Sequence, residues 1–213
     1  WDRLAADRVD EFIAISRTVQ ARIRKIYRRD AQIIYPPVET SLPAERAAPE
    51  DYYLIVSRLV PYKRIDLAVQ AFNRLGLPLR IIGDGRDRAA LQAMARPNIQ
   101  FLGYVRDDGL VRQQMARCRA FIFPGEEDFG IAPLEAMAAG RPVIAYAAGG
   151  ALDTLDEGRT GVFFRQPTPE ALMRAVRELE TLSFDGEAIQ RHAQTFGVAR
   201  FQREMGEMIE RKD

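Results

Sequence analysis

Residues 121–140 read FIFPGEEDFGIAPLEAMAAG. The first three form an apolar run that ends at Pro124 and Gly125, which predicts a buried strand entering a loop. Residues 131–139 have the composition of a helix, and Pro133 suits its first turn because a missing N–H costs nothing there. A loop between a strand and a helix start predicts a ligand site, since the free N–H groups of the first turn favour a phosphate.

The same stretch carries two carboxylates, Glu127 in the loop and Glu135 near the middle of the helix, with seven residues between them. Gly130 allows a ligand to approach the backbone, and Gly140 is the expected C-cap of the helix. We expect both carboxylates to face one crevice. Glu127 would reach a sugar beside the helix start, and Glu135 would lie one turn deeper.

Strands and helices alternate on both sides of this stretch. Continuous apolar runs predict strands, at residues 53–56, 79–82, 99–105, 120–123, 142–146 and 161–164. Helical composition and spacing predict helices between and after them, at residues 63–75, 86–95, 107–118, 131–139 and 169–182. This alternation predicts an α/β fold, a Rossmann-like open parallel sheet with helices on both faces.

The two ends of the chain depart from this pattern. In residues 1–40 the sequence predicts a short strand at 9–15, a basic helix at 17–29 and a second short strand at 31–35. Prolines and small residues give residues 41–50 the composition of a linker. Residues 183–213 carry only helical signals, with three glycines as expected breaks, at Gly186, Gly197 and Gly206.

Composition narrows the functional classes. The 213 residues include 31 Lys plus Arg against 30 Asp plus Glu, so no bulk field points to nucleic acid. The single cysteine, Cys118, excludes an internal disulfide and suits a reducing cytoplasm. No uninterrupted apolar run is long enough to span a bilayer. Residue 1 is Trp, and we expect the chain to be a piece of a longer protein.

Candidate ligand residues follow the ends of the expected strands. In an open parallel sheet, ligands bind outside the carboxyl ends of the strands, where the strand order reverses. Arg58 and Lys63 come after the first strand, Gly83 after the second and Glu127 after the fourth. Two cations, glycines and carboxylates on one rim predict a phosphorylated ligand that also offers hydroxyl groups.

Four motifs together resemble the C-terminal domain of family-four glycosyltransferases, which are retaining enzymes with the two-domain GT-B architecture. The motifs are Ser57-Arg58 with Lys63 five residues later, GDG at 83–85, Glu127-x7-Glu135 and GRPVI at 140–144. Within that family, RLVPYKRID and PGEEDFGI, at 58–66 and 124–131, are similar to bacterial mannosyltransferases of polysaccharide biosynthesis. The resemblance covers roughly residues 13–201.

The resemblance implies a role for each matching residue. Arg58 and Lys63 would bind the donor's diphosphate and offset the charge that grows on the leaving group. Glu127 would accept hydrogen bonds from the donor sugar and is the third catalytic candidate, with Arg58 and Lys63. Glu135 would hold the ribose hydroxyls. The other candidates would contact the base, phosphate or sugar in part through their main chain: Gly83, Tyr104, Val105, Phe129, Gly130 and Ile131.

The resemblance also implies domain limits. Residues 1–40 would be a remnant of the N-terminal acceptor domain and 41–50 a linker. Residues 51–182 would form the nucleotide-sugar-binding domain, and the helices of 183–213 would return toward the N-terminal domain. The acceptor pocket would lie in the absent part, so we expect this fragment alone to be inactive and to self-associate through residues 1–29.

The expected reaction moves a hexose, mannose from GDP-mannose, onto a saccharide or lipid-linked acceptor with retention. The nucleotide sugar is a substrate, and we expect no cofactor and no metal, because cations and the helix dipole neutralise the diphosphate. We expect a cytoplasmic location that extends to the inner face of the membrane, with peripheral association of the full-length enzyme.

Several alternatives stay open on the sequence alone. The fragment could be a nucleotide-sugar binding module without turnover, or part of a GT-B-type epimerase or phosphorylase. Gly83 could belong to a plain turn, and Tyr104 and Val105 could be core residues.

Overall fold

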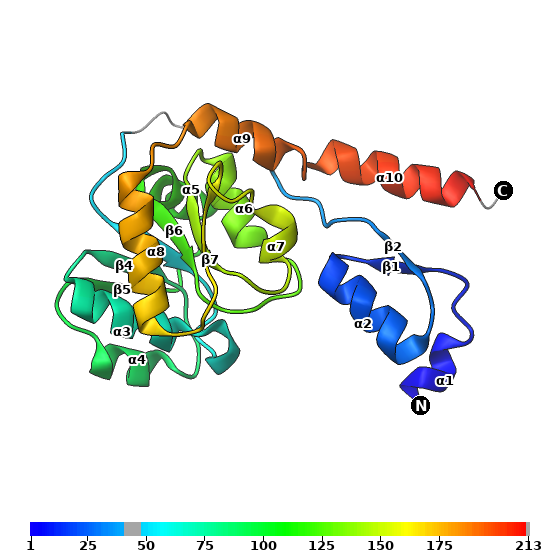
Figure 1. The fold of residues 1–213 in the computed structure, drawn as a ribbon, viewed down its shortest axis with the longest axis horizontal. Helices are drawn as coiled ribbons and strands as arrows, with labels where there is room; N and C mark the ends of the chain where they lie inside the picture. Colours follow the sequence, from blue (N-terminus) through cyan, green and yellow to red (C-terminus); the bar gives the residue numbers. More distant parts are fainter. Residues whose placement is uncertain (41–47, 212–213) are drawn as a thin grey trace.

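The computed structural model describes residues 1–40 and 48–211, so the predicted linker 41–50 falls largely outside the described residues. The chain forms two lobes (Figure 1). We call residues 51–194 the α/β lobe and residues 1–40 the N-terminal lobe.

The α/β lobe is built on a six-stranded sheet in which every neighbouring pair is parallel. Its strands are β3 (Tyr53–Val56), β4 (Leu79–Ile82), β5 (Ile99–Gly103), β6 (Ala120–Phe123), β7 (Val143–Tyr146) and β8 (Gly161–Phe164). The spatial order is β5-β4-β3-β6-β7-β8, so the strand order reverses between β3 and β6. The predicted α/β fold class is confirmed, and a ligand crevice is expected at this reversal.

Helices cover both faces of the sheet (Figure 1). One layer packs on the first face and contains α3 (Ile65–Leu75), α4 (Arg88–Met94) and α8 (Pro169–Thr181). The other layer contains α5 (Asp108–Arg117), α6 (Ile131–Ala138) and α9 (Gly186–Gln194). The sheet is therefore enclosed between two helical layers, as its continuous apolar strands require.

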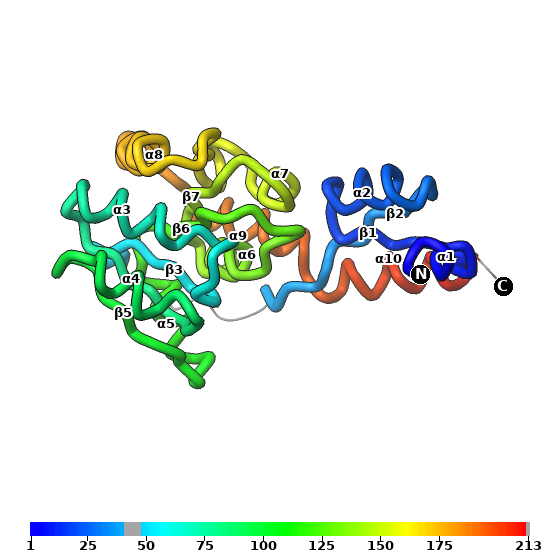
Figure 2. The backbone as a smooth tube through the Cα atoms, turned by 90° about the horizontal axis from the view of Figure 1, so that it is seen from below, coloured from blue at the N-terminus to red at the C-terminus, as the bar shows by residue number. Residues whose placement is uncertain are grey.

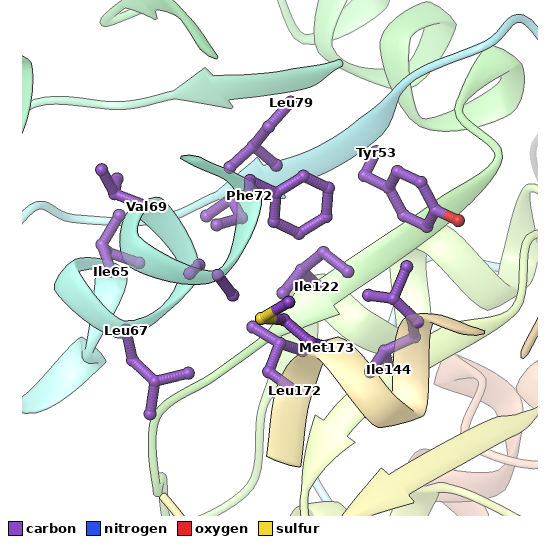
Figure 3. Close-up of a cluster of buried hydrophobic side chains, with 14 of the residues drawn as sticks. Tyr53, Ile65, Leu67, Val69, Phe72, Leu79, Ile122, Ile144, Leu172 and Met173 are labelled. Atoms are coloured by element: carbon purple, nitrogen blue, oxygen red, sulfur yellow. The ribbon is translucent and has the colours of Figure 1, made fainter. Parts of the chain in front are cut away.

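Large apolar side chains fill the space between the sheet and the α3/α8 layer (Figure 3). Phe72 from α3 meets Tyr53 from β3 edge-on, with ring centroids 5.1 Å apart. Leu172 from α8 is fully buried beside them, as are Ile122 and Ile144 from β6 and β7. Burial of each such side chain stabilises the fold by about 1.5–3 kcal/mol, so this core fixes the position of the strand ends.

The N-terminal lobe is small. It contains α1 (Asp2–Ala6), β1 (Phe12–Ala14), α2 (Arg17–Tyr27) and β2 (Ala31–Ile33), with β1 and β2 paired in parallel. The last helix, α10 (Val198–Glu210), leaves the α/β lobe and runs along this pair of strands (Figure 2). Arg211 donates to the side chain of Gln32 at 2.9 Å, which joins the end of α10 to β2.

The chain crosses between the lobes twice, and the two crossings lie side by side. Val38, on the way into the α/β lobe, forms a parallel bridge with Gly197, on the way out. The Val38 N–H donates to the Phe196 carbonyl at 3.0 Å. The lobes are therefore joined by a paired hinge.

The predicted element bounds agree with the observed ones to within three residues, and many are identical; the differences are of the size usual at frayed ends. Gly140, with φ 77°, directly follows the C-cap Ala139, which agrees with its predicted place at the helix end. The predicted break at Gly206 is wrong, because this residue lies inside the continuous helix α10 with open space around it. A single exposed glycine weakens a helix without ending it.

Candidate functional site

A hollow of about 980 Å³ opens at the carboxyl ends of β3, β4 and β5, between α5 and α6. We call it the main hollow. Its volume is at the upper end of the range of small-molecule sites, roughly 300–1,000 Å³. Its lining includes charged, aromatic and glycine residues from the loops after β3, β4 and β5 and from α5 and α6, among them Arg58, Gly83, Tyr104, Val105, Arg112 and Glu135.

Arg58 follows β3 at the point where the strand order reverses. Its side chain is exposed, and within residues 1–40 and 48–211 nothing forms an ion pair or hydrogen bond with its guanidinium. A planar, permanently charged fork without a partner in a concave site is suited to a phosphate or carboxylate. The main hollow can therefore hold an anionic group beside β3.

Gly83 is required by the packing of two loops. Its φ is 132°, and a Cβ there would lie 1.8 Å from the carbonyl oxygen of Ser57. A Cβ on Gly85 would likewise lie 2.3 Å from the carbonyl oxygen of Leu59. These glycines let the loop after β4 close on the loop after β3, so the Gly83 turn has a structural role as well as a place in the wall of the main hollow.

The opposite wall of the main hollow comes from the loop after β5 and from α6. Tyr104 is 71% exposed, so the alternative that it is a core residue is wrong; Val105 is half-buried against the core. Glu135 retains solvent contact but is crowded by protein atoms. This desolvation raises the pKa of its carboxyl, an effect opposed by Arg112 and reinforced by Asp108.

Lys63 and Glu127 form an ion pair. Their side chains are only 15% and 21% exposed. The pair is close because Gly125 lets the acidic loop lie on the Lys63 backbone; a Cβ at Gly125 would be 2.8 Å from the Lys63 Cα. Lys63 itself ends a short 3₁₀ turn, Pro61–Lys63, rather than starting the predicted helix.

Glu127 does not line the main hollow, whereas Glu135 does. The expectation that both carboxylates face one crevice is therefore not met. The backbone of the acidic loop is held from behind, since the Gly150 N–H donates to the Glu127 carbonyl at 2.7 Å. The two carboxylates therefore lie in different environments: Glu127 is paired with Lys63, and Glu135 faces the open main hollow.

The start of α6 has the predicted geometry. Gly130 is its N-cap with φ 93°, and Ile131, its first residue, is 48% exposed. Among the described residues, no acceptor meets the backbone N–H groups of residues 130–132. Phe129 is only 4% exposed and its ring stacks on Tyr35, so the structure places this candidate ligand residue in the core.

The sequence did not single out the residues that α5 contributes to the main hollow. Asp108 and Arg112 lie one turn apart on α5, and both line it. Their spacing of four residues on one helix face was a usable signal. What the sequence lacked was the direction of that face, which depends on how α5 packs on the sheet.

Metal and thiol chemistry have few candidate groups. In the part of the chain that the structure describes, no three His, Cys, Asp or Glu side chains come together as metal ligands. Burial raises the pKa of Cys118 to about 12, which leaves it a poor nucleophile. No described helix combines the length and apolar character needed to cross a membrane.

The sequence matches the family Glycosyl transferases group 1 over residues 40–195. The chain therefore belongs to this family. Among curated proteins it is 25% identical to an uncharacterised glycosyltransferase of Methanocaldococcus jannaschii, an alignment that covers 83% of this chain and 51% of that protein. It is 33% identical to a GDP-mannose-dependent alpha-mannosyltransferase of Mycobacterium tuberculosis, covering 70% of this chain and 41% of the relative. The chain thus spans about half the length of these relatives.

Solved structures share the fold. The lipopolysaccharide outer core galactosyltransferase WaaB superposes with a TM-score of 0.82 at 24% identity, over 96% of this chain and 63% of that one. Anabaena HepE, in complex with UDP and glucose, superposes with a TM-score of 0.82 at 21% identity, over 97% of this chain and 65% of that one. The α/β lobe has the architecture of GT-B glycosyltransferase C-terminal domains.

Proposed function

We propose that this chain is the donor-binding part of a retaining glycosyltransferase that transfers mannose from GDP-mannose to a saccharide or lipid-linked acceptor. The observation that carries the proposal is the Arg58 guanidinium in the main hollow, which has no ion-pair or hydrogen-bond partner among the described residues. The same loop after β3 carries Lys63, paired with Glu127 of the acidic loop. Such a rim offers positive charge to a diphosphate and a carboxylate to a sugar.

In the proposed complex the nucleotide lies in the main hollow. Tyr104 and Val105 border the base, and Glu135 accepts hydrogen bonds from the ribose hydroxyls. The diphosphate lies between Arg58 and the free N–H groups at the start of α6, where the helix dipole favours negative charge. Lys63 adds a second cation, and Glu127 accepts hydrogen bonds from the donor sugar.

In the proposed reaction the bond between the anomeric carbon and the phosphate oxygen breaks. The acceptor hydroxyl oxygen forms a bond to that carbon on the same face, and its proton passes to the departing phosphate. Negative charge then accumulates on the diphosphate between Arg58 and Lys63, so both cations act more strongly in the transition state than in the ground state.

The choice of mannose rests on relatives. The Mycobacterium tuberculosis relative is named for GDP-mannose, while a glycogen synthase of Xanthomonas campestris is 32% identical over 58% of this chain. A glucose donor is therefore the second candidate. Neither reading alters the roles proposed for Arg58, Lys63 and Glu135, which contact parts common to all nucleotide sugars.

Isothermal titration of the 213-residue chain with GDP-mannose, UDP-glucose and ADP-glucose tests the proposal. We expect GDP-mannose to bind most tightly, and Arg58→Ala to weaken binding about 10- to 100-fold, the loss of a charge-assisted hydrogen bond. Arg86→Ala is the matched control, because Arg86 lies on the adjacent loop, exposed and outside the main hollow. Absence of binding to all three donors, or equal effects of the two variants, would overturn the proposal.

A further inference from the structure

A second hollow, of about 440 Å³, lies beside the acidic loop and shares no lining residue with the main hollow. It is formed by loops that follow β3, β6 and β8, by the last residue of β7, and by α2 of the N-terminal lobe. Its principal lining side chains are Arg22, Tyr62, Arg64, Glu126, Asp128 and Tyr146.

Two of these loops divide their side chains between the second hollow and the ion pair. Tyr62 and Arg64 line the second hollow, whereas Lys63 between them turns to Glu127. Arg64 has a left-handed backbone, with φ 52°, which is rare for a residue with a side chain. Backbone strain of this kind gathers at functional sites, where it places neighbouring side chains.

The acidic loop shows the same division. Glu126 and Asp128 line the second hollow, whereas Glu127 between them pairs with Lys63. The proposed sugar-binding carboxylate and phosphate-binding lysine therefore each stand between two residues of the second hollow. Whatever occupies this hollow lies next to the donor sugar of the proposed function.

The side chains of the second hollow suit a neutral, polyhydroxylated ligand. Tyr62 is 59% exposed, and Tyr146 is half-buried with its ring tilted on Phe164 at 5.5 Å. Exposed aromatic rings pack against the C–H face of a sugar, and their hydroxyls add a polar edge. The Lys63 ammonium lies over the Tyr62 ring, 5.2 Å from its centroid, so this stacking surface adjoins the Lys63–Glu127 ion pair.

The second hollow has no excess of positive charge. Two arginines, Arg22 and Arg64, stand against two carboxylates, Glu126 and Asp128, and Arg64 also pairs with Asp66 at 3.2 Å, outside the hollow. Arg22 pairs with Asp128 at 3.0 Å. A hollow without excess charge disfavours an anion such as phosphate, while its donors and acceptors can hold several hydroxyl groups.

We propose that the second hollow binds the acceptor saccharide. This inference rests on the proposed function, because it takes Glu127 and Lys63 as the donor side of the reaction. Arg22 comes from the N-terminal lobe, so the acceptor is held where the two lobes meet. The donor-binding lobe then supplies part of the acceptor site, rather than leaving all of it to the N-terminal domain.

The test measures saccharide and nucleotide binding separately on the 213-residue chain by ¹H–¹⁵N NMR. Methyl α-mannoside, methyl α-glucoside and maltose are titrated with GDP present, and GDP is titrated alone. We expect millimolar saccharide binding with shifts at residues 62–64 and 126–128. Tyr62→Ala should weaken it about fivefold, the size of one aromatic stacking contact, while Tyr62→Phe keeps the ring and the affinity.

Tyr104→Ala is the reciprocal variant, because Tyr104 is an exposed tyrosine of the main hollow. We expect it to weaken GDP and to leave saccharide binding unchanged, with the opposite pattern for Tyr62→Ala. If GDP binds but no saccharide shifts the spectrum, or if Tyr62→Ala has no effect, the acceptor proposal is overturned and the proposed function stands. If GDP fails to bind, GDP-mannose is excluded as the donor; if GDP, UDP and ADP all fail to bind, both proposals fall.

Discussion

The α/β lobe and the N-terminal lobe are held together by different forces. The α/β lobe has two buried apolar clusters, one on each face of its sheet. In the N-terminal lobe only a few residues are buried, among them Ala14 and Ile23, while Trp1 and Leu4 are 96% and 73% exposed. The α/β lobe is stabilised by its own core, whereas the N-terminal lobe depends on its contacts with the α/β lobe and with α10.

Polar contacts supply much of that support. The Asp153 carboxylate, at the end of α7 (Ala151–Thr154), accepts a hydrogen bond from the Arg17 backbone N–H at 2.8 Å and pairs with its guanidinium. The Asp153 side chain is 2% exposed. Arg22 reaches Asp128 one turn further along α2. Both contacts join α2 to loops at the rim of the sheet, so the position of the N-terminal lobe is coupled to the site.

The contrast predicts opposite results for a glycine substitution in the α/β lobe and one on α10, the helix that lies beside the N-terminal lobe. Gly83→Ala places a Cβ on the Ser57 carbonyl oxygen and forces a left-handed φ on alanine, so the α/β lobe should lose about 4 kcal/mol or more of its free energy of unfolding. Gly206→Ala, on α10 beside the N-terminal lobe, meets open space and should stabilise by roughly 0.5–1 kcal/mol.

Urea titration followed by circular dichroism measures both glycine variants. A Gly83→Ala variant as stable as the parent would show that the two loops can separate without cost. The main hollow would then have a movable wall instead of a fixed one.

A second prediction concerns Asp153. Asp153→Ala removes the acceptor for the first N–H of α2, and a hydrogen bond to a charged group contributes about 1.5–3 kcal/mol. We expect faster hydrogen exchange in residues 12–33 with little change in β3 to β8. Asp156→Ala is the control, because the Asp156 side chain pairs with Arg159 and, among the described residues, forms no hydrogen bond or ion pair with residues 1–40. If residues 12–33 are equally protected from hydrogen exchange in the parent and in Asp153→Ala, the N-terminal lobe is held by α10 and the hinge instead of by Asp153.

The two lobes also differ in how much of their structure could be predicted from the sequence. The strands of the α/β lobe were located nearly to the residue, because continuous apolar runs such as YLIV at 53–56 have one reading in a parallel sheet. The rim positions of Arg58 and Gly83 followed from those strand ends, and that of Glu135 from the predicted helix at 131–139. In the N-terminal lobe, α1 was not predicted, since five residues are too short to show a period.

Contacts between distant loops were also beyond the sequence. The pairing of Lys63 with Glu127 depends on Gly125 and on the strand order that sets β3 beside β6. The second hollow depends further on Arg22, which reaches the acidic loop through the docking of α2. Such contacts arise from packing, which no local pattern encodes.

The smallest expected effect separates stability from binding within the α/β lobe itself. Desolvation raises the pKa of Glu135 above its ordinary 4.5, so the folded state holds the proton more tightly than the unfolded state does. Its contribution to stability is therefore fully present below about pH 4.5 and is lost as the pH rises through the raised pKa. Glu135→Gln, which cannot ionise, should melt at a higher temperature than the parent at pH 7 and at the same temperature at pH 4. It should also bind GDP more weakly, because the charged acceptor for the ribose hydroxyls is lost. Glu210→Gln, the same exchange at an exposed position of α10, gives the background. A Glu135→Gln variant that gains no stability at pH 7 would show that the ionised carboxyl is well solvated in the main hollow. Water would then reach the face of α6 that lies toward the proposed nucleotide site.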